Sequence, residues 1–256
     1  MRVRFWGVRG SVPYATPESI GYGCNTACID LLDEATGRRL VLDAGSGIVG
    51  LGNAIASGRH EVAILLTHYH WDHIQGLPYF KPFYTPGQTL SVWAPERIQG
   101  APPIEAMFRA PFFPIDFDRL ASRPAIRMVT TGATTINGFD VRVQGLNHPG
   151  GSFAYRIRGA RRDLVYATDH EFGDRAIDEA LTDFAADAGA LILDAHFAPE
   201  ELPSRRGWGH ADWRACATFA KACRAGHLWL THHKPGRSDQ ALERVEAEAR
   251  LIFPDT

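Results

Sequence analysis

Four potential metal ligands stand close together in the sequence, directly after the apolar run Ile64–Leu66. They are His68, His70, Asp72 and His73. Where a strand ends the backbone turns, so neighbouring side chains point in different directions and can reach two separate points. One loop of this kind can therefore supply ligands to two metal ions. Imidazole and carboxylate groups together favour zinc, manganese or iron over calcium or magnesium.

The rest of the chain predicts an α/β protein. Short runs rich in Val, Ile, Leu and Phe, bounded by Gly, Pro, Asp or Asn, predict strands. These runs are Val3–Trp6, Ala27–Leu32, Arg39–Leu42, Val62–Leu66, Leu90–Trp93, Ile126–Val129, Phe139–Val143, Phe153–Ile157, Leu164–Tyr166, Leu191–Leu193 and Leu228–Leu230. Helical spacing of apolar residues predicts helices over Gly47–Ser57, Asp212–Ala225 and Ser238–Ile252, the second ending at Gly226 as its C′ residue and the third opening on an N-cap serine.

Length and composition set the frame for these elements. The 256 residues are 45% hydrophobic and 22% charged, which is typical of a globular protein, and we expect a single domain over residues 1–256. A formal net charge of -2 gives no general attraction to polyanions. No apolar run reaches the roughly 20 residues that span a bilayer, so we expect a cytoplasmic protein. Four cysteines in so large a chain predict buried thiols rather than a disulfide framework.

The histidine-rich segment resembles the signature His-x-His-x-Asp-His of the metallo-β-lactamase superfamily. The resemblance extends along nearly the whole chain, through four further motifs. These are the Asp-x-Gly turn at Asp43, Asn147-His148-Pro-Gly, Tyr166-Ala-Thr-Asp169 and Leu230-Thr-His232. The fold class that this resemblance implies is α/β (α+β), a four-layer αβ/βα sandwich of the metallo-β-lactamase fold.

The resemblance also implies a cofactor of two divalent metal ions, zinc in the first instance, with manganese or iron as alternatives. It assigns His68, His70 and His148 to one ion. It assigns Asp72, His73 and His232 to the other, with Asp169 between the two. His233 follows His232 directly, and either could be the last ligand, although Thr231-His232 fits the family pattern better. His196 follows a predicted strand on the same side and is a candidate to line the pocket.

A Gly-His pair narrows the branch of the superfamily. Gly209-His210 stands 22 positions before His232, as in the ribonuclease Z and phosphoribosyl cyclic phosphodiesterase branches, where the histidine contacts the scissile phosphate. Ribonuclease Z carries a long tRNA-gripping arm between the lone-histidine motif and the bridging aspartate. Here the 21 positions from His148 to Asp169 hold little more than a hairpin. The resemblance therefore favours a small phosphodiester substrate over the ends of tRNA.

The segments Arg4–Pro13, Gly23–Thr26, Trp208–His210 and His232–Pro235 resemble a bacterial group of metal-dependent hydrolases related to the phosphoribosyl cyclic phosphodiesterases. We hypothesise a phosphodiesterase that cleaves a small or cyclic phosphodiester with a dimetal-bridged hydroxide. In it His210 is a catalytic residue that either donates a proton to the leaving group or stabilises the developing charge, and Asp72 is both ligand and catalytic residue. Two alternatives stay open: a lactone or thioester hydrolase with the same dimetal site, and a non-catalytic sensor of nucleotides or metal.

Substrate contacts are predicted at three positions. Ser152, two residues after the Pro-Gly of the lone-histidine motif, offers a hydroxyl or a backbone amide to the substrate. Lys234 and Arg237 follow the last ligand and can attract a phosphate. The aromatic residues Phe112, Phe113 and Trp208 are candidates for an interface in a homo-oligomer or for the roof of the pocket. Ligand types alone do not identify the metal, and the pattern does not identify the physiological substrate.

Overall fold

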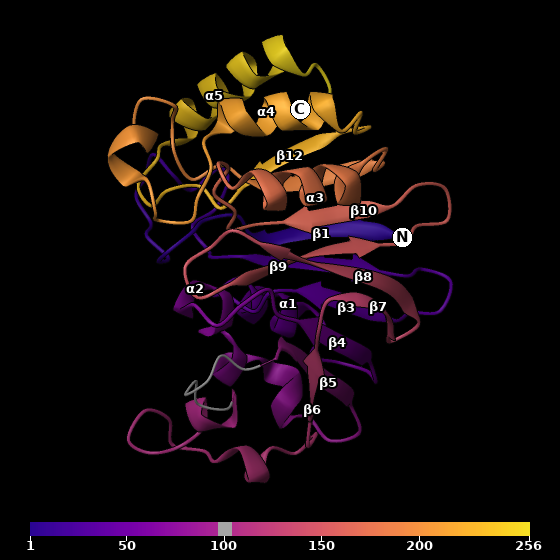
Figure 1. Cartoon of the computed structure of the whole chain (residues 1–256). Helices are drawn as coiled ribbons and strands as arrows, with labels where there is room; N and C mark the ends of the chain where they lie inside the picture. The colour runs from indigo at the N-terminus through magenta and orange to yellow at the C-terminus, as the bar shows by residue number, and fades with distance from the viewer. Residues whose placement is uncertain (97–103) are drawn as a thin grey trace. The chain divides into compact units, whose positions relative to one another are not determined.

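The computed structural model describes residues 1–96 and 104–256, which form two compact units (Figure 1). Unit 1 comprises Met1–Gly7, Asn25–Thr130 and Ile136–Gly138. Unit 2 comprises Val8–Cys24, Thr131–Thr135 and Phe139–Thr256. Each unit is built on one six-stranded sheet and has its own apolar core.

Unit 1 contains a sheet with the strand order β1-β2-β3-β4-β5-β6. The first three strands pair antiparallel, and β3 to β6 pair parallel. The strands are β1 (Arg2–Gly7), β2 (Cys28–Leu32), β3 (Arg39–Leu42), β4 (Glu61–Leu65), β5 (Thr89–Pro95) and β6 (Ala125–Val129). The helices are α1 (Ile48–Ala54) and the single turn α2 (Trp71–Ile74). Side chains of α1 pack on the parallel strands, with Ile48 and Leu51 against Val41 and Ile64.

Unit 2 contains a sheet with the strand order β12-β11-β10-β9-β8-β7. Strands β10, β11 and β12 pair parallel, whereas β8, β9 and β10 pair antiparallel. Its strands are β7 (Gly132–Ile136), β8 (Phe139–Leu146), β9 (Ser152–Ile157), β10 (Leu164–Ala167), β11 (Ala190–Asp194) and β12 (Leu228–Thr231). Its helices are α3 (Arg175–Ala185), α4 (Trp213–Ala222) and α5 (Asp239–Ile252). All three bury apolar side chains in one cluster with alternate residues of β10 and β11, so they cover one face of the sheet.

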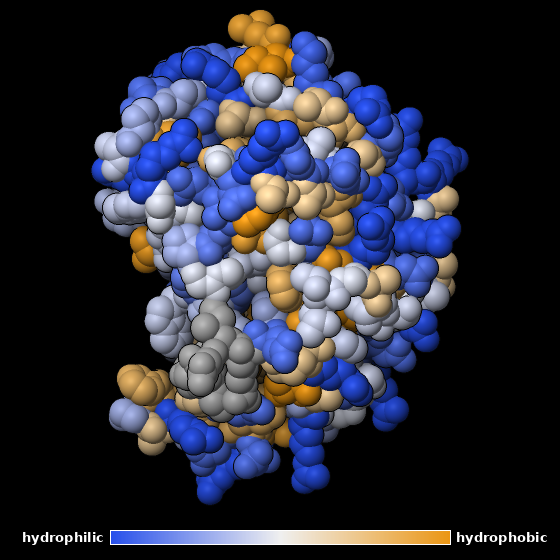
Figure 2. Space-filling view, viewed as in Figure 1, coloured by the Kyte–Doolittle hydropathy of each residue, from blue (hydrophilic) through white to orange (hydrophobic). Residues whose placement is uncertain are grey.

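Short 3₁₀ helices connect several of these elements. They span Leu77–Tyr79, Lys81–Tyr84, Ile104–Met107, Phe117–Arg119 and Leu202–Arg205. No helix of the described residues is long and apolar enough to cross a membrane. On the face shown in Figure 2, hydrophilic residues are interspersed with smaller hydrophobic patches.

The predicted elements agree with the structure in kind and differ at some boundaries. Each of the eleven predicted strands is present within one to three residues of its expected ends, and β7 was not predicted. The helices agree less well. Helices α2 and α3 were not predicted, α1 ends at Ala54 rather than Ser57, and α4 ends at Ala222, before the predicted Gly226. The residue with left-handed backbone after α4 is Arg224, at φ 54°, so the chain turns out of the helix two residues earlier than expected.

Candidate metal centre

In unit 1 the predicted ligands follow β4, in the loop that enters α2. His68, Asp72 and His73 are buried, whereas His70 is exposed at the N-cap position of α2. The imidazole of His68 is close to those of two other ligands. Its ring centroid is 4.5 Å from that of His70 and 4.2 Å from that of His73. The Nε2 atom of His73 is 3.4 Å from Oδ2 of Asp72. Unit 1 therefore brings its four predicted ligands into one cluster.

Asp43, at the end of β3, fixes the orientation of this cluster. Its buried carboxylate accepts a hydrogen bond from Nδ1 of His73 at 2.9 Å and one from the Thr67 hydroxyl at 3.0 Å. Since that hydroxyl has one proton, it accepts in turn from Nδ1 of His68 at 3.0 Å. Both histidines are thereby held as the Nδ1–H tautomer, which leaves Nε2 with the lone pair that a metal ion needs.

In unit 2 the predicted ligands gather around Asp169, which follows β10. Nε2 of His148 is 3.6 Å from Oδ2 of Asp169, and Nε2 of His232 is 3.4 Å from Oδ1. All three side chains are buried. The two carboxylate oxygens thus face different histidines.

Beside Asp169 lies a second group of donors, Asp194, His196, His210 and His232, which approach closely enough to hold a metal ion. Nδ1 of His210 donates a 2.6 Å hydrogen bond to Oδ2 of Asp194 and lies 3.9 Å from Oδ2 of Asp169. The ring of His210 stacks on those of His196 and His232, with centroids 4.5 and 5.0 Å apart. Asp194 orients His210, because its carboxylate accepts the hydrogen bond from Nδ1.

His196 is held in its neutral form. Its Nδ1–H donates to the backbone oxygen of His232 at 3.0 Å. Burial, together with the neighbouring His232, lowers the pKa of His196 to about 4. A neutral imidazole stacked on His210 contributes no charge, so it does not repel a proton on that ring.

The loop before α4 is tied to His148 through Gly209. Nδ1 of His148 donates to the backbone oxygen of Gly209 at 2.8 Å, which again leaves Nε2 with the lone pair. Gly209 has φ 81°, and a Cβ there would stand 2.2 Å from Nδ1 of His148. The carboxylate of Glu171 accepts from the backbone N–H groups of Gly207 and Gly209 at 2.8–2.9 Å. The loop that carries His210 is therefore positioned by the same contacts that orient His148.

Three site residues have left-handed backbone although they are not glycine. They are Asp43, Asp169 and His232, with φ of 60°, 58° and 56°, and each stands where a strand ends. Such a conformation is uncommon for residues with a Cβ, and it clusters at functional sites. A further constraint applies at Gly10, where a Cβ would lie 2.3 Å from the ring of His232.

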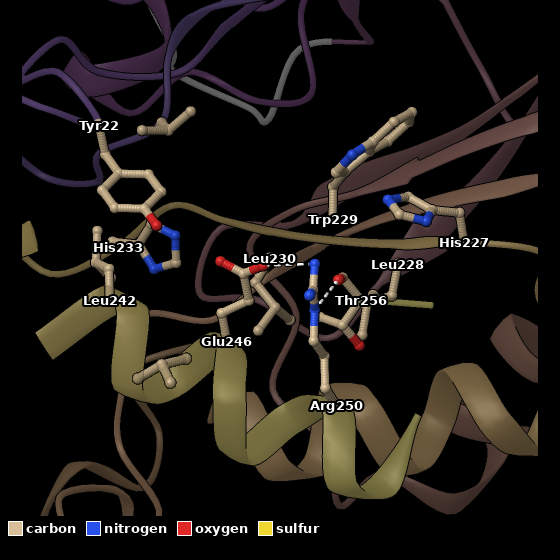
Figure 3. Close-up of a pocket in the computed structure, with 12 residues that line it drawn as sticks. Tyr22, His227, Leu228, Trp229, Leu230, His233, Leu242, Glu246, Arg250 and Thr256 are labelled. Atoms are coloured by element: carbon tan, nitrogen blue, oxygen red, sulfur yellow. Dashed lines mark hydrogen bonds and ion pairs between the residues drawn. The ribbon is translucent and has the colours of Figure 1, made fainter. Parts of the chain in front are cut away.

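His233 lies in surroundings different from those of His232. Its ring lines a cavity of about 250 Å³, together with Tyr22, Trp229 of β12 and the ion pair of Glu246 with Arg250 on α5 (Figure 3). Burial, with Arg9 and Arg237 nearby, lowers the pKa of His233 to about 3. The buried guanidinium of Arg9 donates to the backbone oxygens of Ser19, Gly23 and Arg237 and so fixes the N-terminal segment beside this turn.

The three predicted substrate contacts lie in contrasting environments. Ser152 is buried at the start of β9, and its hydroxyl has no hydrogen-bond partner among the described residues. Lys234 and Arg237 both bind Glu201, at 2.9 and 2.6 Å. Burial raises the pKa of Glu201, but the hydrogen bonds from Ala198, Lys234 and Arg237 outweigh it and lower that pKa to about 2. The single carboxylate of Glu201 thus balances one of the two positive charges of these side chains.

Several residues of the site were not predicted. Asp43 was noted only as part of a turn, Asp194 and Glu171 were given no role, and His196 was only a pocket candidate. Asp43 and Asp194 stand at the carboxyl ends of parallel strands, and this position was a usable signal. His170 beside Asp169 turns away, because Asn147 N–H donates to its Nδ1 and its Nε2 donates to Asp178 at 3.0 Å.

Comparison with known proteins places these residues in a wider group. Residues 38–233 match the family model described as the Beta-lactamase superfamily domain. A ribonuclease Z of Bradyrhizobium diazoefficiens is 28% identical over 280 residues, which cover 88% of this chain and 89% of that protein. The crystal structure of the metallo-β-lactamase fold protein YhfI from Bacillus subtilis superposes with a TM-score of 0.73 at 20% identity, covering 98% of this chain and 92% of the other. A diphosphatase of the PhnP family superposes with a TM-score of 0.66 at 19% identity, covering 91% and 85%.

Proposed function

Since the chain belongs to the metallo-β-lactamase superfamily and is a metallohydrolase of that fold, we propose that it cleaves a small or cyclic phosphodiester. The observation that carries the proposal is the pair formed by Asp194 and His210, joined by a 2.6 Å hydrogen bond beside Asp169. An oriented imidazole of this kind can give a proton to a leaving alkoxide. A general acid in this role typically contributes about 10²- to 10⁴-fold to the rate.

We propose that the ligand sets of the two units bind the same two metal ions. His68, His70 and His148 would hold one ion, Asp72, His73 and His232 would hold the other, and Asp169 would be a ligand of both. The chemistry of the ligands fits a metal ion. In His68, His73 and His148, Nδ1 donates its proton to a protein acceptor, so Nε2 carries the lone pair that binds metal. Nitrogen and carboxylate donors favour zinc, with manganese or iron as alternatives. When bound, such ions neutralise phosphate oxygens and acidify water.

The residues of the chain then divide the work. Asp194 accepts the Nδ1 hydrogen bond of His210, and His210 in its charged form donates the Nε2 proton to the leaving oxygen. Asp194 stabilises the charged imidazolium before that transfer, while the neutral His196 supports the ring by stacking. The position of Nε2 of His232 against Asp169 supports His232, rather than His233, as the last ligand. Ser152 is proposed to offer its hydroxyl to the substrate, with Lys234 and Arg237 contributing after exchange with Glu201.

We propose a small substrate because the segment between His148 and Asp169 is compact. Residues 158–163 only connect β9 to β10, so this segment offers no long arm for gripping tRNA. The alignment with a ribonuclease Z of Lacticaseibacillus casei spans 312 positions, which is more than the 256 residues of this chain. We propose that residues 1–256 act as one functional domain, because the proposed metal ligands come from both units.

One experiment tests the proposal. The purified protein is analysed for bound metal and assayed with bis(p-nitrophenyl) phosphate, a panel of cyclic nucleotides and a lactone. We expect two metal ions per chain and chelator-sensitive cleavage of the diester. His210→Ala should lower kcat at least about 100-fold with metal retained, whereas His60→Ala, in a turn before β4, should not. Turnover of the lactone alone would replace the proposal with a carboxyl-ester hydrolase, and bound metal without any turnover would favour a sensor.

A further inference from the structure

Unit 1 has an apolar cavity that the proposed chemistry does not use. Its volume is about 600 Å³, within the range of small-molecule sites. It is lined by Tyr69, Trp71, Ile74, Gln75, Pro78, Tyr79, Ile104, Ala106, Met107, Phe112 and Phe113. None of these described side chains carries a charge, and five are aromatic.

The aromatic side chains of this cavity form a floor and a rim. Tyr69 and Phe113 are partly buried against the core, and the Tyr69 hydroxyl donates to the backbone oxygen of Pro95 at 2.7 Å. The rim is formed by Trp71, Tyr79 and Phe112, which are 67%, 63% and 84% exposed. Tyr79 meets Phe113 edge to face, with centroids 5.6 Å apart. Exposed aromatic rings gathered over an anchored floor are typical of a binding site rather than of packing.

The cavity begins one residue from a proposed metal ligand. His70 lies between Tyr69 and Trp71 in the chain, and consecutive Cα atoms are about 3.8 Å apart. His70 is exposed, as is Trp71. The lining of the cavity and a proposed metal ligand are therefore adjacent in the chain.

We propose that this aromatic cavity binds a flat, uncharged aromatic ring carried by the substrate, on the ester oxygen that does not leave. This inference rests on the proposed function, because it takes the substrate to be a phosphodiester. The described lining residues include no charged side chain that could bind a second anionic group, and their exposed ring faces favour stacking over an aliphatic contact. A nucleoside or an aryl group has this chemistry. The substrate class is thus narrowed to aryl or nucleoside phosphodiesters.

The kinetic test keeps the leaving group constant. We compare kcat/KM for four phosphodiesters with p-nitrophenol as the common leaving group. Their second ester group is methyl, cyclohexyl, phenyl or the 5′-linked nucleoside thymidine. We expect the phenyl and thymidine esters to exceed the methyl and cyclohexyl esters by about tenfold, which corresponds to one stacked ring. Trp71→Ala and Phe112→Ala should bring these ratios toward one. Leu251→Ala, an equally exposed apolar residue on α5, should preserve them. Equal ratios in the wild type, a cyclohexyl ester as good as phenyl, or ratios unchanged by Trp71→Ala would overturn the inference.

A binding test separates this inference from the proposed function. Adenosine, which has a flat ring and no phosphate, is titrated into the metal-loaded protein and followed by saturation-transfer NMR. Binding in the wild type and its loss in Trp71→Ala would support the cavity even if no diester is cleaved. If diesters are cleaved but there is neither a preference for a ring nor binding of adenosine, the proposed function stands and the proposed role of the cavity is rejected. Conversion of a dimer to a monomer by Trp71→Ala, seen by sedimentation, would identify the rim as a subunit interface instead.

Discussion

At the scale of single residues, the site is organised by hydrogen bonds to the far side of each imidazole. Asp43, Thr67 and the backbone oxygen of Gly209 take the Nδ1 protons of His73, His68 and His148. Since a histidine can present a lone pair on only one nitrogen when neutral, these acceptors decide which atom faces the proposed metal ions. At His210 the acceptor at Nδ1 is the carboxylate of Asp194, whose negative charge stabilises the imidazolium that can donate a proton from Nε2.

Replacing Asp194 by asparagine tests this reading of His210. The amide keeps the size of the side chain but can donate to Nδ1, which would favour the wrong tautomer. We expect kcat for a phosphodiester to fall by about 10²- to 10⁴-fold with little change in KM. Steady-state kinetics alongside metal analysis would check this. A variant with wild-type kcat would show that Asp194 does not orient the donor, and one that has lost metal would assign Asp194 to the metal centre itself.

At the scale of elements, the sequence predicted the strands well because apolar runs bounded by turn residues are a local signal. Helix α3 was missed because its buried face is sparse, with Leu181, Phe184 and Ala185 among charged residues. Its start at Asp174, whose side chain accepts from Ala176 N–H and Ile177 N–H, was a signal that could have been read. The ligand list came from a resemblance between motifs. The pairings of Asp43, Asp194 and Glu171 depend on contacts between distant segments, which spacing along one chain does not reveal.

The loop before α4 provides a matched pair of glycine variants. Gly207 and Gly209 have nearly the same φ, 84° and 81°, but only at Gly209 would a Cβ meet His148. Both Gly→Ala changes should cost about 1–3 kcal/mol in backbone strain. Gly209→Ala should in addition displace His148 and weaken metal binding. Urea unfolding and chelator competition would separate the two effects. Equal metal affinity in both variants would contradict the proposed link between this loop and His148.

At the scale of the whole molecule, membership of the superfamily and the fold are settled by the match over residues 38–233 and by the superposition on YhfI, as the sequence predicted. The substrate is not settled by the fold, since one fold serves many chemistries. The four cysteines are free thiols, with Cys24 partly exposed and the other three buried, in agreement with the expectation of no disulfide framework. Burial raises the pKa of the Cys216 thiol well above its usual value, which makes it unreactive at neutral pH.

Global stability should fall on mild acidification because of His233. Its pKa is about 3 in the folded protein and about 6.5 when unfolded, so the unfolded chain binds the proton more tightly. The stabilisation is complete above pH 6.5 and is lost progressively as the pH falls toward 3. The urea midpoint should therefore drop between pH 7 and pH 5. His233→Asn should be less stable at pH 7 and show a smaller drop, whereas His60→Asn should behave as wild type. An identical drop in both variants would assign the effect to other groups.

The left-handed backbone at Asp43, Asp169 and His232 has a consequence for engineering. Glycine or asparagine would relieve the strain at these strand ends, yet each change would remove a carboxylate or imidazole that the proposed chemistry needs. A library selected only for heat resistance is therefore expected to accumulate substitutions at these three positions and lose activity as it does so. A library selected for turnover should keep all three and recover stability elsewhere, so the two selections would diverge first at the residues where the strands turn.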